Sequence, residues 1–500
     1  MHKAGPLRPS RRPATLERRR GFWLLCALLL TALLCRPAKQ PADQKLVLWM
    51  DGEFNDWQGI ATHPLRGGPD TVPQLRGMAV ANDDRFLYLR IDVDREANLQ
   101  RRNSFALWLD FDPDSRTGSP EPELYYRFSE RSGRRFQNGE AEPISHADLG
   151  ISTMPTFSSK SFEMSIPLSA LRDLAPGKTI GIGLTSAPAA DRCSDYHLHC
   201  LSSLPYQPPA PSMEKRDPSH LRLLVYNVLL DGLFKRPEVF KRIFSAVGAD
   251  VVLLLEVFDH SAGQVMEWWR TADITPVSAH WHAFGHPGKV TLSRFPFADT
   301  LVFDHNLCTR ISLPGAPKGI WIISCHLACC DADSARQQQA NEIMRRLTDA
   351  QQGRSMDWVI AKETPIVIAG DFNLVGDARQ FQTLKYGCES GDEYSPPDWD
   401  GSELEDVRAF HLGARELYTW RDDDSSFSPG RLDFVFYTGS VLEPVNCYVL
   451  RTPELSGSLL RRKGLKRRDT QIASDHLPLV VDFVRLTDVS ERVTSGKPGP

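Results

Sequence analysis

The chain has 500 residues, of which 41% are hydrophobic, and this is enough for two or three domains that each bury a core. The formal net charge is −4, which excludes a protein that binds nucleic acid through an overall positive field. Function therefore has to be inferred from local motifs.

The N-terminal residues carry the pattern of an export signal. The first twenty residues hold seven Lys and Arg against the single acidic residue Glu17, and an uncharged apolar run from Phe22 to Cys35 follows. This length fits the apolar part of a signal peptide better than the ~20 residues that span a bilayer. No A-x-A cleavage site follows, so cleavage and a single uncleaved membrane anchor both stay open. We expect residues 1–40 to be a signal peptide or anchor and the rest to lie outside the cytoplasm, secreted or anchored.

Residues 45–190 predict an all-β domain. Short apolar segments such as RFLYLRIDV (85–93) and SFALWLDFD (104–112) alternate with turn residues, and no long helical period appears. This texture is typical of an antiparallel β-sandwich. The segments DGEFNDWQGI, WLDFDPDSRTG and FEMSIPLSAL resemble the family 9 carbohydrate-binding modules and their relatives.

That resemblance implies a possible carbohydrate ligand for the sandwich. Aromatic side chains that could stack on sugar rings are Trp57, Trp108, Tyr125 and Tyr126, although aromatic residues of a sandwich more often belong to its core. A Ca²⁺ site is a second hypothesis, because alternate carboxylates in a loop suit an oxygen-preferring ion. Its ligands would come from Asp110, Asp112, Asp114, Gly118 and Glu121. The alternative is a solvated acidic turn.

A Pro-rich stretch at 201–220 predicts a semi-rigid linker between two domains that differ in their pattern of predicted strands and helices. Just before it, Cys193 and Cys200 are the best disulfide candidates if the compartment is oxidising. After it, strands alternate with helical segments such as 237–248 and 334–350. We expect a separate α/β layered domain over 221–485 and a short tail over 486–500.

In the second domain, six short apolar segments each end in polar residues. Segments of this kind predict strands of a covered sheet, whose ends converge in a layered fold. The polar residues are Asn227, Glu256, His326, Asp371, Asn373, Asp433, Asp475 and His476. Their carboxylate and amide oxygens suit Mg²⁺ or Mn²⁺, and the imidazoles can bind phosphate oxygens or move protons. The set predicts metal-assisted displacement at phosphorus. A zinc site at Cys325, Cys329 and Cys330 is disfavoured, because adjacent cysteines do not easily reach one tetrahedral ion.

The motifs GDFN (370–373), SDH (474–476) and RLDFVFY (431–437) resemble those of the endonuclease/exonuclease/phosphatase superfamily. The resemblance covers about 221–485 and implies a DNase I-like four-layer αββα sandwich. It further implies that Glu256, Asn227 and Asp475 hold the metal, and that Asp371 and Asn373 position the attacking water and the phosphate. It leaves His476, held by Asp433, as either a ligand of the scissile phosphate or a base, with His326 as a second phosphate-facing histidine.

The fold and the metal site do not select a substrate, because one fold can serve many phosphoesters. A basic segment at 461–468 suggests contacts with the phosphates of a nucleic acid, which we favour over phospholipid. Its basic residues are Arg461, Arg462, Lys463, Lys466, Arg467 and Arg468. A solvated mobile loop, or pairing with the acidic segment 421–426, is the alternative. A sphingomyelinase-like lipid phosphodiesterase, a phosphatase and an inactive extracellular binding protein are the competing functions.

Overall fold

The computed structural model describes residues 46–486 apart from 66–72, 102, 114–121, 138–139, 172–173, 187–192, 194–195, 273, 275–279, 388 and 391–392. The predicted export signal, the predicted Ca²⁺ ligands Asp114, Gly118 and Glu121, and nearly all of the C-terminal tail lie outside the described residues. In the part that is described, no helix is both long and apolar enough to cross a membrane.

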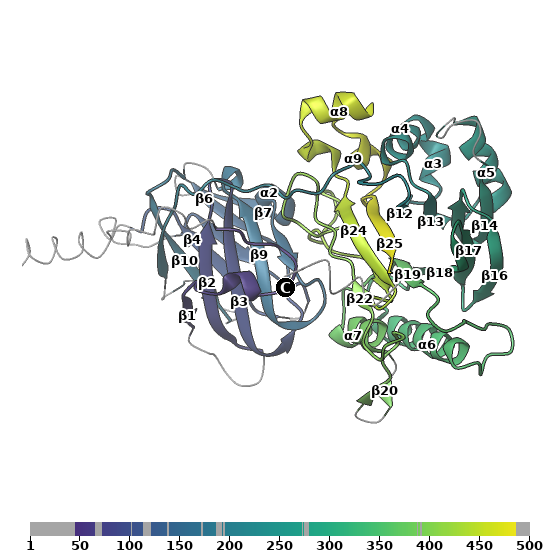
Figure 1. Ribbon diagram of the computed structural model, residues 1–500. Coiled ribbons are helices and arrows are strands. Elements are labelled where there is room, and N and C mark those ends of the chain that lie inside the picture. Colours follow the sequence, from purple (N-terminus) through teal and green to yellow (C-terminus); the bar gives the residue numbers. More distant parts are fainter. Residues whose placement is uncertain are drawn as a thin grey trace, which may run out of the picture.

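The N-terminal domain is a sandwich of two antiparallel sheets (Figure 1). The first sheet has the strand order β1 (Thr62–Pro64), β2 (Leu75–Asn82), β3 (Phe86–Ala97), β9 (Ser159–Pro167) and β8 (Ser152–Met154). The second has the order β11 (His197–Cys200), β10 (Thr179–Thr185), β4 (Ala106–Asp110), β5 (Leu124–Arg127), β6 (Ser132–Gln137) and β7 (Glu140–Ser145). The short elements η1 (Asn55–Trp57), α2 (His146–Leu149) and η2 (Leu168–Ala170) complete it. The predicted all-β sandwich is confirmed.

Buried apolar residues alternate with partly covered polar residues along the strands, and the apolar residues form the core of the sandwich. On β3, Leu87, Leu89 and Ile91 are fully buried and pack on the opposite sheet, whereas Arg90 and Asp92 are only partly covered. The same packing corrects the proposed sugar-stacking residues, because Trp57, Trp108 and Tyr126 are at most 4% exposed. These three rings are interior packing, and only Tyr125 of the four is partly exposed.

The C-terminal domain contains two six-stranded mixed sheets. The first runs β14 (His282–His286), β15 (Gly288–Ser293), β13 (Val251–Val257), β12 (Leu221–Asn227), β25 (Leu479–Arg485) and β24 (Leu442–Val449). The second runs β16 (Phe297–Phe303), β17 (Asn306–Leu313), β18 (Ala316–His326), β19 (Ile366–Asp371), β23 (Asp433–Tyr437) and β22 (Glu405–Asp406). A small hairpin, β20 (Glu389–Ser390) and β21 (Glu393–Tyr394), stands apart. Parallel pairing joins β12 to β13 and β18 to β19, and the remaining pairs are antiparallel.

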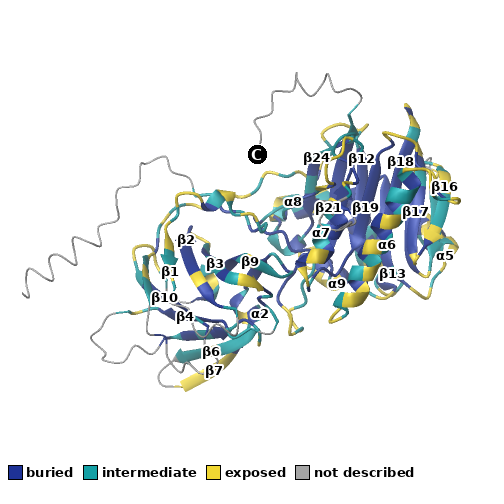
Figure 2. Ribbon diagram, turned by 90° about the horizontal axis from the view of Figure 1, so that it is seen from below, coloured by how far each residue is buried: buried dark blue, intermediate teal, exposed yellow. Residues whose placement is uncertain are grey.

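Helices cover the outer face of each sheet, so the domain has the predicted four layers. The first sheet packs against α3 (Gly232–Lys235), α4 (Pro237–Val247), α5 (Ala262–Thr271), α8 (Gly457–Lys463) and α9 (Asp469–Ala473), with η3 (Thr452–Glu454) beside them. The second packs against α6 (Asp333–Gln351) and α7 (Ala378–Tyr386). A third apolar cluster fills the space between the two sheets. Figure 2 shows the central strands buried and the outer faces of these helices exposed.

The two domains are joined by a buried polar interface. Arg415 of the C-terminal domain is 2% exposed, and its Nη2 lies 2.6 Å from Oδ2 of the fully buried Asp83 in the sandwich. Ser165 Oγ donates to Glu416 Oε1 over 2.6 Å. The Phe157 ring stacks on the Phe381 ring of α7, with 5.0 Å between the ring centroids. Buried, directional contacts of this kind fix how the sandwich sits on the C-terminal domain.

Candidate active site

Strand register brings three of the predicted residues into one row. His326 ends β18 and pairs with Asp371 at the end of β19, and Asp371 in turn pairs with Asp433 at the start of β23. All three strands are covered on both faces, which explains their continuous apolar runs. His326 and Asp371 stand where their runs stop, and Asp433 stands where its run begins. Because β23 is antiparallel to β19, the three residues form a row at one edge of the second sheet.

The glycine of the GDFN motif is required by close packing at this row. Gly370 has φ +151°, and a Cβ at this position would lie 1.9 Å from the carbonyl oxygen of Cys325 on the neighbouring strand. Any other residue would push β19 away from β18. The separation between His326 and Asp371 therefore depends on this glycine.

The first sheet supplies Asn227 and Glu256. Asn227 is buried at the end of β12, and its Nδ2 donates to Glu256 Oε1 over 2.9 Å and to Asp371 Oδ2 over 3.1 Å. Glu256 has φ +61°, a conformation that costs energy for a residue with a side chain and is concentrated at functional sites. One amide thus links carboxylates from the two sheets across the centre of the domain.

His476 lies between two carboxylates. Its Nδ1 is 2.8 Å from Asp433 Oδ2 and its Nε2 is 3.5 Å from Asp371 Oδ2. Burial alone would lower the pKa of His476, but Asp433 and Asp371 outweigh burial and raise this pKa to about 10. Burial also raises the pKa of Asp371, although His476 opposes this shift. The shorter contact makes Asp433 the principal counter-ion of the imidazolium.

His326 and Asn373 complete the second sheet's contribution. His326 Nε2 is 3.6 Å from Asp371 Oδ2, and burial together with Lys289 and His476 lowers its pKa to about 4. Asn373 has φ +50°, and its Nδ2 donates to the carbonyl of Leu327 over 3.1 Å. Asn373 thereby holds the end of the β18 strand beside the row.

Asp475 is held by a residue that the sequence analysis missed. Trp420 Nε1 donates to Asp475 Oδ2 over 2.9 Å, while Ser474 Oγ donates to the carbonyl of Asn227. Trp420 lies in a long irregular segment before β23, so no periodic pattern marked it. Its indole N–H therefore holds the Asp475 carboxylate at the pocket.

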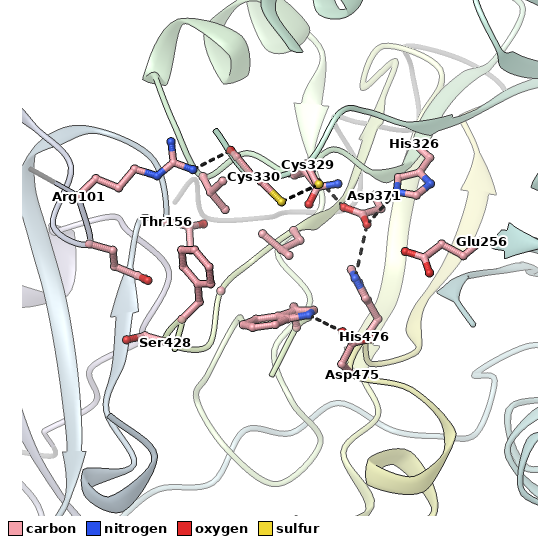
Figure 3. A pocket seen from close by; sticks show the side chains of 17 residues that line it. Arg101, Thr156, Glu256, His326, Cys329, Cys330, Asp371, Ser428, Asp475 and His476 are labelled. Atoms are coloured by element: carbon pink, nitrogen blue, oxygen red, sulfur yellow. Dashed lines mark hydrogen bonds and ion pairs between the residues drawn. The ribbon is translucent and has the colours of Figure 1, made fainter. Parts of the chain in front are cut away.

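These residues open into a pocket of about 230 Å³ (Figure 3). The structure brings together all eight residues proposed for catalysis and metal binding. Six of them line the pocket: Glu256, His326, Asp371, Asn373, Asp475 and His476. The other two contact these six, since Asn227 donates to Asp371 and Asp433 pairs with His476. The pocket is also lined by Gln100, Arg101 and Thr156 of the sandwich.

The six basic residues of 461–468 are not brought to this site. Only half of them lie in a loop: 461–463 are the last turn of α8, which Ser456 caps at its start and Gly464 ends with φ +67°, and Lys466, Arg467 and Arg468 lie in the connection to α9. None of the six is among the described residues that line the pocket. Lys463 instead pairs with Glu214 over 2.7 Å. In the acidic segment 421–426, Asp423 pairs with Arg421 of the same segment.

The proposed disulfide pair and the acidic turn lie in the sandwich, apart from this row. Cys193 and Cys200, the proposed disulfide pair, are not joined by a disulfide. Cys325 is buried at the β18 end, whereas Cys329 and Cys330 are exposed at the pocket. Of the Ca²⁺ candidates, Asp110 and Asp112 do lie together with Glu123, with one ligand atom of each within 4.8 Å of the others.

The family model described as "Endonuclease/Exonuclease/phosphatase family" matches residues 224–476, half of the chain. The chain belongs to this family. Membership confirms the resemblance carried by GDFN and SDH, and it makes the protein a phosphoester-hydrolysing enzyme. No curated protein sequence matches the chain.

Solved structures similar to the chain include members of this family. A humanized D. rerio TDP2 shares 16% identity, with 53% of this chain and 99% of that chain covered at a TM-score of 0.34. The human nocturnin catalytic domain shares 16%, covering 54% and 95% at a TM-score of 0.34. A family protein from Bacteroides thetaiotaomicron shares 15%, covering 56% and 98% at a TM-score of 0.32.

Proposed function

We propose that this family member is an extracytoplasmic, divalent-metal-dependent phosphodiesterase that cleaves nucleic acid by in-line attack of water. The observation that carries the proposal is the position of Asp371. Its Oδ2 lies within 3.6 Å of His326, His476 and Asn227 at once, at the base of an open pocket. A carboxylate set among imidazoles and an amide suits handling of water and phosphate together.

The donor set fits a hard divalent ion. Glu256 and Asp475 both line the pocket with carboxylate side chains, and Asn227 donates to Glu256 Oε1. Mg²⁺ and Mn²⁺ accept such oxygens, and Mg²⁺ typically keeps several waters and takes only one or two carboxylates beside substrate phosphate. When bound, the ion would supply Lewis-acid polarisation of the phosphoryl group and stabilisation of the leaving oxygen.

The remaining residues have roles that follow from their hydrogen bonds. Because Asp433 and Asp371 both favour the imidazolium form, His476 acts as a donor to the scissile phosphate rather than as a base. Asp371 is left to accept the proton of the attacking water, a role that its raised pKa suits near neutral pH. His326 stays neutral above about pH 4 and donates one N–H to the phosphate.

The test is a substrate panel on a protein of residues 41–500, which keeps both domains. Each substrate is assayed with Mg²⁺, with Mn²⁺ and with chelator. Single-stranded DNA, RNA, plasmid DNA, bis(p-nitrophenyl) phosphate and sphingomyelin are the substrates. We expect hydrolysis of nucleic-acid substrates that chelator abolishes and that Asp371→Asn lowers at least 100-fold. Asp299→Asn, an exposed carboxylate on β16, is the matched control. Chelator-resistant hydrolysis would overturn the proposal.

A lipid phosphodiesterase is the second candidate, and one observation favours it. Leu230 and Phe258 are each 51% exposed, and the backbone N–H of Leu230 donates to Glu256 Oε2 over 3.0 Å. Exposed apolar side chains beside the site could contact acyl chains. Hydrolysis of sphingomyelin without hydrolysis of any nucleic acid would select this candidate.

Export is the part of the proposal that rests on residues 1–40 alone. Their basic stretch followed by a short apolar run is the supporting pattern. Fusion of residues 1–45 to a reporter that is active only outside the cytoplasm tests it. Replacing Leu28, Leu29 and Leu30 by Asp should abolish reporter activity, and activity that survives this change would contradict export.

A further inference from the structure

The wall of the pocket that faces Glu256 belongs to the β-sandwich. Gln100, Arg101 and Thr156 lie far outside residues 224–476, which are the part that matches the family. In Figure 3, Arg101 and Thr156 stand on one side of the pocket, Glu256 and His326 on the other, and Asp371 and His476 between them. The reacting site is therefore bounded by a domain that is additional to the family core.

Short hydrogen bonds hold this wall in place. Thr156 Oγ1 donates to the carbonyl of Arg431 over 3.1 Å, and Asn98 Nδ2 donates to the carbonyl of Val375 over 2.9 Å. Arg101 Nη2 donates to the carbonyl of Cys330 over 2.7 Å. These three bonds join the sandwich to segments of the C-terminal domain around the pocket. They hold the wall at a fixed distance from the catalytic row before a substrate binds.

An aromatic ring faces the pocket from the segment between Trp420 and β23. Phe427 is 41% exposed although it lines the pocket. The guanidinium of Arg131 in the sandwich lies 4.3 Å from the centre of the Phe427 ring, and Arg131 also donates to the carbonyl of Gln100 over 3.0 Å. A ring braced in this way presents apolar area at small entropic cost, as a stacking platform requires.

The charges around the pocket do not suit a long polyanion. Arg101 is the only Arg or Lys among the described residues that line it, and it already pairs with Asp333 over 3.2 Å and with Asp331 over 3.4 Å. Double-stranded DNA is bound mainly through many unpaired cationic contacts to phosphates. A substrate that enters here must be recognised by shape and by ring stacking instead.

On the basis of the proposed phosphodiesterase activity, we propose that the pocket accepts a single unpaired nucleotide, with its base stacked on Phe427 and its phosphodiester at Asp371. The wall formed by Gln100, Arg101 and Thr156 bounds the pocket on the side opposite Glu256, so that the pocket of about 230 Å³ takes one nucleotide and not a base pair. The substrate class is then a single-stranded end or a small nucleotide diester, and a closed duplex is excluded.

The test compares Phe427→Ala with Phe427→Trp on a short single-stranded oligonucleotide and on the same strand with one abasic site. We expect Phe427→Ala to lower kcat/KM on the intact strand roughly 5- to 150-fold, the range for loss of one base stack. Phe427→Trp should retain activity, because it keeps a ring. On the strand whose abasic site occupies the pocket, Phe427→Ala should have almost no further effect.

The wall is tested by Gln100→Trp, which narrows the pocket from the sandwich side. We expect it to raise KM for the oligonucleotide at least tenfold. Glu142→Trp on the exposed face of β7 is the matched control and should leave KM unchanged. Wild-type enzyme should cleave covalently closed plasmid at least 100-fold more slowly than single strands. Equal rates on both, or equal rates for wild type and Phe427→Ala on the intact strand, would overturn the inference.

Binding separates this inference from the proposed function. The Asp371→Asn variant should bind a fluorescent oligonucleotide, which fluorescence anisotropy measures. Adding Phe427→Ala to this variant should weaken the affinity for the oligonucleotide. Wild-type enzyme that hydrolyses nothing but binds in this Phe427-dependent way would refute the hydrolytic function and retain the nucleotide site. Hydrolysis and binding that are both independent of Phe427 would retain the function and refute the site.

Discussion

His476 Nδ1 lies 2.8 Å from Oδ2 of Asp433, and both side chains are buried. The other oxygen of Asp433, Oδ1, is buried without a hydrogen-bond partner among the described residues. Asp433 therefore accepts from Nδ1–H of the His476 imidazolium and leaves Nε2–H on the pocket side. The pair positions one N–H donor where a phosphate oxygen would lie.

The first prediction concerns this pair. Asp433→Asn should keep the size of the side chain but remove the charge that favours the imidazolium, so kcat should fall on the order of 10²–10⁴-fold while KM changes little. Steady-state kinetics on single-stranded DNA measures it. The unfolding midpoint of the variant should stay close to that of wild type, and a kcat within threefold of wild type would show that Asp433 has no role.

The second prediction concerns metal binding. Glu256→Gln keeps the hydrogen bond geometry with Asn227 but removes one negative charge from the pocket. We expect Mn²⁺ binding, measured by electron paramagnetic resonance of the free ion, to weaken at least tenfold. Glu267→Gln on the exposed side of α5 is the matched control. Unchanged Mn²⁺ affinity would remove Glu256 from the set of ligands.

Much of the catalytic row could be predicted from the sequence, for a physical reason. His326 and Asp371 follow apolar runs and Asp433 precedes one, and the register of the three paired strands aligns these ends because β23 runs antiparallel to β19. Helices 237–248 and 334–350 were likewise visible, and α4 and α6 match them closely. Local pattern and tertiary structure agree in these elements.

What the sequence did not reveal depends on contacts between distant segments. Trp420 reaches Asp475 across 55 positions, and Arg101 reaches Cys330 across 229, without any local pattern that marks either. The charge run at 461–468 did not show that 461–463 end a helix, although Ser456 and Gly464 are ordinary helix start and stop residues. Nor could it show that none of its basic residues is among the described residues that line the pocket.

The third prediction is a loss of stability in acid. Burial and neighbouring histidines lower the pKa values of His197 and His199 on β11 to about 4. In the unfolded chain these groups titrate near 6.5, so between pH 6.5 and 4 the unfolded state binds more protons and the free energy of unfolding falls as pH falls. Urea titrations across this range measure the slope.

A variant isolates the contribution of one histidine. His199 Nε2 lies 2.9 Å from Asn82 Oδ1, and Gln at this position can still donate to that oxygen without titrating. The free energy of unfolding falls between pH 7 and 4, and we expect His199→Gln to make this fall smaller by on the order of 1–2 kcal/mol. His280→Gln on the surface is the control. Identical slopes for wild type and His199→Gln would contradict the assignment.

The fourth prediction tests whether the sandwich and the catalytic domain form one unit. Arg415 and Asp83 are both buried at the interface, and the Arg415 guanidinium also lies 4.4 Å from the Tyr206 ring. Removing one partner leaves an unpaired buried charge, so Arg415→Ala should lower the free energy of unfolding by about 3–5 kcal/mol. Arg408→Ala removes a partly exposed pair with Asp51 at the same interface and should cost about 1 kcal/mol or less.

Activity provides a second measurement of the same interface. Because Gln100 and Thr156 keep their places only while the sandwich stays docked, Arg415→Ala should also raise KM for a single-stranded oligonucleotide, whereas Arg408→Ala should not. The double variant Arg415→Ala/Asp83→Ala leaves no buried charge and should recover part of the lost stability. If Arg415→Ala unfolds at the same urea concentration as wild type, the domains are not coupled through this pair.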